Sequence, residues 1–217
     1  MTSVVPLTVA QIVKASGARA AEAEKFLPYL QGTCKAYDIT SPRRIAGFLS
    51  QIGHESAGFT RLTENLDYSV QALLTMFGRH RITEKQAHLY GRKPGQRANQ
   101  EGIANCIYGG KWGADNLGNV KPGDGWRFIG RGLKQLTGRD NYKRCGIALA
   151  EDFITYPDRL LMPVNAALSA GWFWSTHGLN SAADRGDVEA MTKLVNGGPN
   201  GLEKRIALYH QGMAVFA

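Results

Sequence analysis

The sequence has few of the features that mark disulfide-rich, zinc-binding or membrane-spanning proteins. Only three cysteines occur in its 217 residues, at Cys34, Cys106 and Cys145, and no CxxC pair is among them. An odd and scattered set of cysteines argues against a disulfide framework and against a structural zinc site. No apolar run approaches the ~18 residues that a membrane-spanning helix needs. We therefore expect no stable insertion into a membrane.

The first residues also lack the cationic start and the long apolar core of a signal peptide. We expect the chain to be made in the cytoplasm of the producing cell, and to reach the outside only if another agent releases it. No repeat of fixed period and no shift in composition interrupts the sequence, which argues against a solenoid and against a linker. We predict one domain over residues 1–217, with no separate binding module.

Acidic residues are the scarcer charged type, with 18 Asp and Glu against 26 Lys and Arg, so the net charge is +8. A basic surface suits an anionic partner, such as nucleic acid, anionic lipid headgroups or the carboxylates of peptidoglycan. No helix-turn-helix, zinc-finger or RNP pattern accompanies the charge, so we expect no nucleic-acid partner. Charge alone does not decide between the other partners.

Several catalytic signatures are absent. The HExxH metal motif would need a histidine at position 58, where Gly58 stands. A dinucleotide fingerprint starting at Gly130 would need a third glycine at position 135, which is Gln135. No GxSxG or Cys/His signature occurs either. These absences exclude the common metalloprotease, dinucleotide-binding and serine-hydrolase patterns.

Apolar periodicity predicts a mainly α-helical fold. Thr8 is placed to cap a short helix, and Ser41-Pro42 is a helix start signal for a buried helix that reaches Glu55. Further helices are predicted at about 19–37, 66–77, 163–176 and 201–216. The stretch from about 92 to 138 holds ten glycines between 102 and 138 and has no lasting period, which predicts an irregular Gly-rich lobe with a short hairpin.

The last predicted helix carries an apolar stripe of Leu202, Ile206, Tyr209 and Met213. We predict that this stripe docks on the core. The alternative is a basic amphipathic helix that perturbs an anionic membrane. Among the aromatic residues, Trp172-Phe173-Trp174 is predicted to lie in the core. Trp112 and Trp126 fit either of two roles, stacking on a sugar or packing in a small satellite core.

Two carboxylates stand out as candidate catalytic groups. Glu55 falls at the edge of the apolar stripe of its helix, and partial burial raises the pKa of a carboxyl group, as a general acid requires. Spacing alone fits an ordinary helix-edge glutamate better. Glu64 follows across a predicted break at Gly58. Two carboxylates separated by ~6.5–9.5 Å with a water between them are the minimum for inverting glycoside hydrolysis, but such pairs are common in sequences.

The segment after Gly130 offers polar groups for such a site. If 133–137 is extended, Gln135 and Thr137 point to the same face, where they could bind sugar hydroxyls or hold a water. A plain hairpin with polar edges is the equal alternative.

Four motifs in order resemble glycoside hydrolase family 19, which includes plant chitinases and many phage endolysins. They are His54-Glu55-Ser56, then Glu64, then GRGLKQLTGRDNY from Gly130, then VNGGPNG from Val195. The likeness spans about residues 40–210. The segments ENLDYS, YGGKWG and GDGWRF resemble the endolysin branch more than the plant enzymes. The resemblance implies a lysozyme-like bilobal α-helical domain.

The resemblance also implies roles for individual residues. Glu55 matches the general acid, Glu64 the general base, and Thr137 the residue that helps to hold the nucleophilic water. The implied substrate-binding positions are Gln135, Asn141, Asn196 and Arg205, and Tyr68 is expected to line the same cleft because it lies just after Glu64. Of these, Arg205 is expected to orient the base carboxylate and keep it ionised. No metal and no organic cofactor are implied.

The resulting expectation is an endolysin-type enzyme, a monomer whose partner is the glycan strand of peptidoglycan. It would cleave the β-1,4 bond as an inverting muramidase and serve lysis of the host cell. A family 19 chitinase is the close alternative, since its chemistry would be identical. A lytic transglycosylase needs only one acid/base carboxyl, so a requirement for Glu64 would count against it. A wall-binding module without activity is the non-enzymatic alternative.

Overall fold

The computed structural model describes residues 6–216 and confirms the mainly α-helical prediction. Residues 1–5 and residue 217 lie outside the described range. The predicted absence of a signal peptide rests in part on residues 1–5, and the predicted domain ends at residue 217. Within 6–216, β structure is limited to isolated bridges, and no helix combines the length and apolarity needed to cross a bilayer. The helices are α1 (Val9–Ser16), α2 (Ala20–Ala36), α3 (Pro42–Glu55), α4 (Val70–Met76), α5 (Glu84–Tyr90), α6 (Gln100–Ile107), α7 (Gly110–Leu117), α8 (Asp124–Arg127), α9 (Arg139–Leu149), the 3-10 helix η1 (Pro157–Leu161), α10 (Pro163–Thr176), α11 (Leu179–Asp184), α12 (Val188–Asn196) and α13 (Leu202–Phe216).

The chain forms two compact units. Unit 1 comprises residues 1–62, 132–135 and 159–217, and unit 2 comprises residues 63–131 and 136–158. The backbone therefore passes from one unit to the other at four points. Unit 1 holds α1–α3 and α10–α13, whereas unit 2 holds α4–α9.

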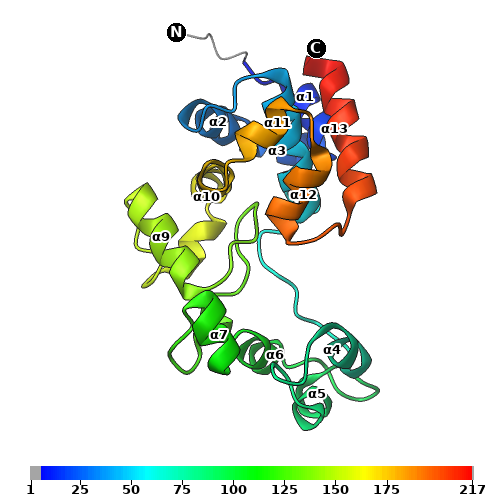
Figure 1. The fold of residues 1–217 in the computed structure, drawn as a ribbon, viewed down its shortest axis with the longest axis vertical. Coiled ribbons are helices and arrows are strands. Elements are labelled where there is room, and N and C mark those ends of the chain that lie inside the picture. Colours follow the sequence, from blue (N-terminus) through cyan, green and yellow to red (C-terminus); the bar gives the residue numbers. More distant parts are fainter. Residues whose placement is uncertain (1–5, 217) are drawn as a thin grey trace. The chain divides into compact units, whose positions relative to one another are not determined.

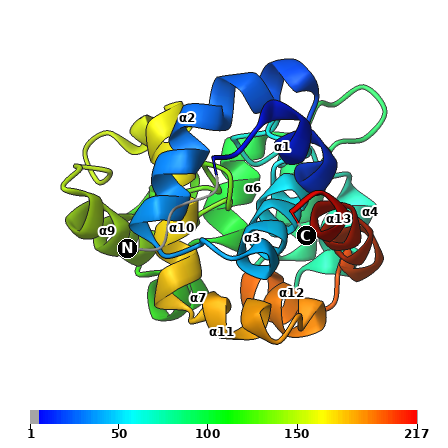
Figure 2. The same ribbon diagram turned by 90° about the horizontal axis from the view of Figure 1, so that it is seen from above.

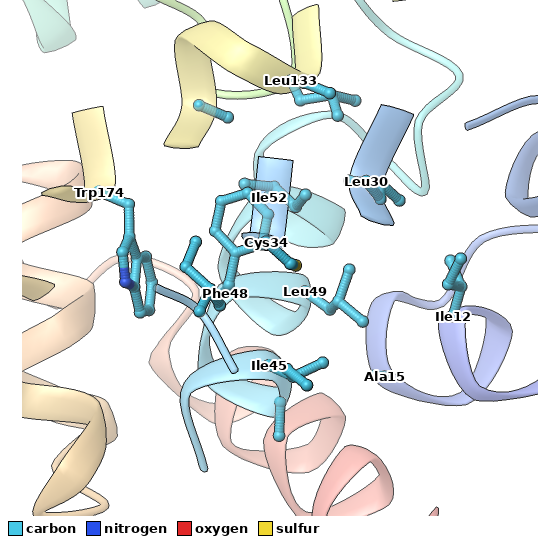
Figure 3. Packing of buried hydrophobic residues seen from close by; sticks show 14 of the residues in the cluster. Ile12, Ala15, Leu30, Cys34, Ile45, Phe48, Leu49, Ile52, Leu133 and Trp174 are labelled. Atoms are coloured by element: carbon cyan, nitrogen blue, oxygen red, sulfur yellow. The ribbon is translucent and has the colours of Figure 1, made fainter. Parts of the chain in front are cut away.

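Helix α3 is the centre of unit 1. Its start follows the predicted signal, because the Ser41 side chain accepts a hydrogen bond from Arg44 N and Pro42 occupies the first turn. The helix packs against α1, α11, α12 and α13 (Figure 1), and Phe48, Leu49 and Trp174 fill the core around it (Figure 3). The burial of Trp172 and Trp174 confirms that the aromatic run belongs to the core.

Close approach of α1 to α3 depends on Gly53. A Cβ at Gly53 would lie 2.2 Å from the carbonyl oxygen of Ser16, the last residue of α1, so any larger residue would push the two helices apart. The end of α3, which carries Glu55, is thereby held against α1. On the other side of the unit, α10 lies along α2 (Figure 2).

The C-terminal helix α13 docks on this core, as predicted. It packs against α3, α1 and α12, with Tyr209 buried and Leu202, Ile206 and Met213 packed against the core cluster. Its apolar stripe is therefore occupied within unit 1.

Unit 2 has a separate core, and its structure corrects the prediction of an irregular stretch over 92–138. Leu66, Leu73, Ile103 and Ile107 form the centre of this core, and three short helices, α6, α7 and α8, occupy the stretch. The physical reason is that several glycines cap helices instead of forming loops. For example, Gly118 ends α7 with a left-handed φ of 66°, which glycine adopts without strain.

Candidate active site

Glu55 is the last residue of α3, and its carboxylate forms an ion pair with a buried arginine. Arg205 Nη2 on α13 donates a hydrogen bond to Glu55 Oε1. The Arg205 side chain is 1% exposed and that of Glu55 is 14% exposed. Within residues 6–216, Glu55 Oε2 has no hydrogen-bond partner. One carboxyl oxygen is therefore fixed, and the other is available to carry a proton or to meet a ligand.

The arginine is itself held by a buried polar chain across three helices. Arg205 Nη1 donates to Gln51 Oε1 at 2.6 Å, and Gln51 Nε2 donates to Thr192 Oγ1 at 3.3 Å. Thr192 Oγ1 donates in turn to the carbonyl oxygen of Val188 at 2.8 Å. Buried groups that hydrogen-bond to one another in this way hold one another in place, and among the described residues Arg205 Nε is the donor of this chain that has no partner. The chain from α12 through α3 to α13 therefore fixes the direction of the Glu55 carboxylate.

This position corrects one expectation from the sequence. Arg205 was expected to orient the base carboxylate, but the structure pairs it with Glu55, the expected acid. The reason is that α13 packs directly on α3, which brings position 205 next to the end of α3. Because it is almost fully buried, Arg205 is placed to position Glu55 rather than to touch a substrate.

Two further cationic or titratable side chains lie near Glu55. Burial lowers the pKa of Lys134, the negative charge of Glu55 raises it, and the positive charge of Arg205 lowers it. The Nζ atom of Lys134 lies 4.3 Å from the centroid of the Phe173 ring. Burial and the charge of Arg205 likewise lower the pKa of His54. The surroundings of Glu55 are thus positive and partly desolvated.

Glu64 is held by contacts of its backbone and both carboxylate oxygens within unit 2. Its backbone N–H donates to the carbonyl oxygen of Gly130 at 2.9 Å, and Gly130 N donates back to Glu64 Oε2 at 3.0 Å. The Tyr108 hydroxyl donates to Glu64 Oε1. Both oxygens act as acceptors, which orients the carboxylate and leaves further lone pairs for another donor, such as a water.

Tyr108 is supported by an arginine that stacks on aromatic rings. Burial, followed by the charge of Glu64, raises the pKa of Tyr108 far above its usual range, so its hydroxyl remains a donor. The Arg81 guanidinium lies 3.7 Å from the centroid of Trp112 and 5.8 Å from that of Tyr108, and Arg81 Nε donates to the carbonyl oxygen of Ile107 at 2.8 Å. The arginine thus packs one face of Trp112 and places a positive charge behind Tyr108.

Three other predicted site residues belong to unit 2. Tyr68 packs edge-on against Phe77, with ring centroids 5.5 Å apart, and burial together with the charge of Glu64 raises its pKa. Asn141 Nδ2 donates to the carbonyl oxygen of Thr137 at 2.8 Å. The structure thus brings Tyr68 into the electrostatic range of Glu64 and ties Asn141 to Thr137.

The remaining two predicted residues belong to unit 1. Gln135 ends a turn with a φ of 58°, and its Nε2 donates to the carbonyl oxygens of Gly132 at 2.9 Å and of Arg61 at 3.4 Å. Residues 132–135 form a turn closed by an antiparallel bridge between Arg131 and Leu136, so of the two alternatives for this segment the hairpin forms and the extended arrangement does not. Asn196 is exposed at the end of α12, and its Nδ2 donates to the carbonyl oxygen of Gly198 at 3.4 Å.

Six residues of these networks were given no role in the sequence analysis. Gln51 carried a usable signal, since it lies one helical turn before Glu55 on the same helix. Tyr108, Gly130 and Lys134 lie within motifs quoted for the family resemblance, but their partners could not be predicted from those motifs. Arg81 and Thr192 reach their partners only through tertiary packing and carried no signal.

Comparison with known proteins places the chain among glycoside hydrolases, although no family model matches it. It is 39% identical over 165 residues to a protein of Haemophilus influenzae named as a glycosyl hydrolase family 19 domain-containing protein, and the match covers 76% of each chain. It is also 42% identical over 53 residues to acidic endochitinase Q of Nicotiana tabacum, which is 23% of this chain and 20% of that protein.

Solved structures show the same fold. Chitinase C of Streptomyces griseus matches with a TM-score of 0.59 and 18% identity over 100% of this chain and 78% of that one. A bacterial family 19 chitinase matches with a TM-score of 0.58 and 20% identity over 98% and 96% of the two chains. Together with the extent and identity of the Haemophilus match, the helical fold shows that this chain belongs to glycoside hydrolase family 19.

Proposed function

We propose that this glycoside hydrolase cleaves the β-1,4 bonds of bacterial peptidoglycan with inversion, as an endolysin-type muramidase that acts on the wall once released from the producing cell. Glu55 serves as the general acid and Glu64 as the general base. The observation that carries the assignment is the contrast between the two carboxylates: Glu55 is held by one oxygen only, whereas Glu64 accepts hydrogen bonds on both.

The free oxygen of Glu55, and not its positive surroundings, supports the role of the acid. With Oε1 fixed by Arg205, Oε2 can carry the proton and transfer it to the leaving glycosidic oxygen as the bond to the anomeric carbon breaks. Because only 14% of the Glu55 side chain is exposed, few water molecules compete with the leaving oxygen for its proton. In this mechanism Arg205, Gln51 and Thr192 position the acid and do not contact the reacting atoms.

The environment of Glu64 supports the role of the base. Tyr108 and Gly130 fix its direction, and a free lone pair accepts a proton from the water that attacks the anomeric carbon. The proton lost by the water goes to Glu64, and the proton given by Glu55 stays on the leaving sugar, so one water is consumed for each bond cut. We propose that Thr137 helps to hold this water, and that Tyr68, Gln135, Asn141 and Asn196 bind sugar hydroxyls.

Chitin is the alternative substrate, and the names of the endochitinase relatives favour it. The net charge of +8 favours peptidoglycan, because its peptide stems carry carboxylates whereas chitin is neutral. A lytic transglycosylase would use a hydroxyl of the substrate in place of water and would not need a base that holds a water.

Mass spectrometry of the fragments released from purified peptidoglycan tests the proposal. Products with a reducing-end N-acetylmuramic acid are expected. A reducing-end N-acetylglucosamine would mean that the other glycosidic bond is cut, an anhydro-muramic acid end would mean a transglycosylase, and release of sugar from chitin but not from wall would mean a chitinase. Proton NMR of the first product formed should show the α-anomer, which inversion of a β-bond requires.

A further inference from the structure

Residues 79–97 form a strongly basic and mostly exposed segment of unit 2. Residues 79–97 contain six lysines and arginines and one acidic residue, a net charge of +5 out of the +8 of the whole chain. Five of these six cations are exposed. The exception is Arg81, which packs on Trp112. The exposed cations of this segment are Arg79, Lys85, Arg92, Lys93 and Arg97.

Three of the exposed cations are presented by a fixed turn after α5. The backbones of Lys93 and Gln96 exchange two hydrogen bonds of 3.0 and 2.9 Å, and Gly95 closes the turn with a φ of 77°. Gln96 Nε2 donates to the carbonyl oxygens of Gly91 at 2.6 Å and Leu89 at 3.1 Å. The amide of Gln96 thus caps the end of α5 and fastens the turn to it.

Beside this turn lies a hollow of about 690 Å³, here called the cationic hollow, which is lined by Ser69, Arg92, Lys93, Pro94, Gly95, Gln96 and Arg97. No acidic side chain is among these lining residues. Arg92 Nε lies 3.2 Å from Asp67 Oδ1, in a pair whose side chains are about half exposed. Within residues 6–216, Arg97 has no ion pair. Positive charge in the hollow is therefore only partly balanced.

The cationic hollow is joined through the backbone to the strand of chain that carries Glu64. Arg92 N donates to the carbonyl oxygen of Tyr68 at 2.8 Å, and Val70 N donates to the carbonyl oxygen of Arg92 at 3.2 Å. Glu64, Tyr68 and Arg92 consequently belong to one fixed part of unit 2. A polymer held at Glu64 and Tyr68 can extend to the hollow without leaving this unit.

We propose that the cationic hollow binds the carboxylates of the peptide stems of peptidoglycan, while the glycan strand lies at Glu64. The proposal rests on the proposed function. Guanidinium groups pair with carboxylates through two parallel N–H donors, and Arg92 and Arg97 supply two such groups at the hollow. The site would favour peptidoglycan over a neutral polysaccharide by holding the stems and not by changing the chemistry at the glycosidic bond.

Sedimentation with purified wall, on ice and at low salt, tests the proposal. The variant Arg92→Gln/Lys93→Gln/Arg97→Gln is expected to bind with a Kd about ten-fold higher than the wild type. The matched control, Lys14→Gln/Lys35→Gln/Lys143→Gln, removes three exposed charges elsewhere and is expected to change Kd less than about two-fold. Arg97 makes no side-chain hydrogen bond or ion pair within residues 6–216, so Arg97→Glu serves as a second variant if the triple variant is unstable.

Two treated walls identify the anion. Converting wall carboxylates to glycinamide amides should weaken wild-type binding to the level of the triple variant, whereas stripping phosphate polymers with hydrofluoric acid should leave it unchanged. The proposal would be overturned by an equal loss of binding in the triple variant and the control, or by unchanged binding in both hollow variants. It would also be overturned if wild-type binding were lost only after phosphate removal. Fragment analysis tests the proposed function separately, so an enzyme that cuts wall normally but ignores these changes would refute the hollow alone.

Discussion

At the scale of single residues, the candidate site depends on how each carboxylate is held. Arg205 reaches one oxygen of Glu55 and leaves the other without a partner in residues 6–216, whereas Tyr108 and Gly130 occupy both oxygens of Glu64. A group that must give a proton needs a free oxygen, and a group that must take one needs a fixed direction toward the water. The two environments therefore lead to different predictions.

Glu55→Gln should abolish wall hydrolysis and leave the fold intact. The amide can still accept the hydrogen bond from Arg205, but it cannot supply the proton to the leaving oxygen, a loss of roughly 10²–10⁴-fold in kcat. Turbidity loss of purified wall measures the effect, and circular dichroism checks the fold. Glu24→Gln, an exposed change on α2, is the control. A folded Gln variant with more than about a tenth of wild-type activity would remove Glu55 from the mechanism.

Tyr108→Phe should lower kcat by about ten- to hundred-fold with little change in KM. The ring that packs near Arg81 is retained, but the charge-assisted hydrogen bond that orients Glu64 Oε1 is lost. Steady-state kinetics on a soluble glycan fragment separate kcat from KM. Tyr29→Phe, at a tyrosine that is 36% exposed, is the control. A wild-type kcat in the Tyr108 variant would show that the base does not depend on this contact.

His54 should make unfolding sensitive to mild acid. Because burial and Arg205 lower its pKa in the folded chain, the unfolded chain binds a proton first as the pH falls below about 6.5. Folding stability is then lost between that value and the lower folded pKa, and does not fall further below it. The drop in Tm from neutral to mildly acidic pH should thus be smaller in His54→Gln than in the wild type and in the control His88→Gln. Equal drops in all three proteins would contradict the prediction.

At the scale of helices, elements marked by local sequence signals could be predicted, whereas elements that depend on tertiary packing could not. Ser41-Pro42 and the apolar period after it are local, so α3 and the position of Glu55 at its end could be predicted from sequence. The glycines between 102 and 138 were misinterpreted because the same residue ends a helix and forms a loop, and only packing on the unit 2 core shows that α6, α7 and α8 form.

The pairing of helices could not be predicted from sequence for a related reason. Arg205 and Glu55 are 150 residues apart, and nothing in either neighbourhood indicates that α13 lies on α3. The family resemblance implied the roles proposed for the two carboxylates but gave the wrong partner for Arg205. Likewise, the contact of Tyr108 with Glu64 requires the fold of unit 2 and has no periodic signature.

Helix α13 is predicted to be indispensable to the fold. A chain that ends at Gly201 would lose the helix that covers α3 and α1, together with Arg205, and would expose the apolar core behind it. Expression of residues 1–201 should give a protein with reduced helical circular dichroism and no wall hydrolysis. A folded and active truncation that had lost only its action on intact cells would instead support a membrane role for α13.

At the scale of the whole molecule, the net charge of +8 should make activity on wall depend on salt. Screening lengths fall from ~8–10 Å at physiological ionic strength to ~3 Å at 1 M, so attraction between exposed cations and wall carboxylates should weaken steeply. Turbidity assays at rising salt measure this, with a neutral soluble oligosaccharide as the control substrate. Equal salt dependence on both substrates would show that the charge has no part in binding the wall.

The interleaving of the two units has a consequence for the newly made protein. Helices α1–α3 leave the ribosome early, but the helices that complete their unit lie after residue 158. At roughly 5–20 residues per second, the 150 residues between Glu55 and Arg205 take on the order of 10–30 s to be translated. During that time Glu55 has no arginine to hold it, so its carboxylate is positioned only after α13 has been made.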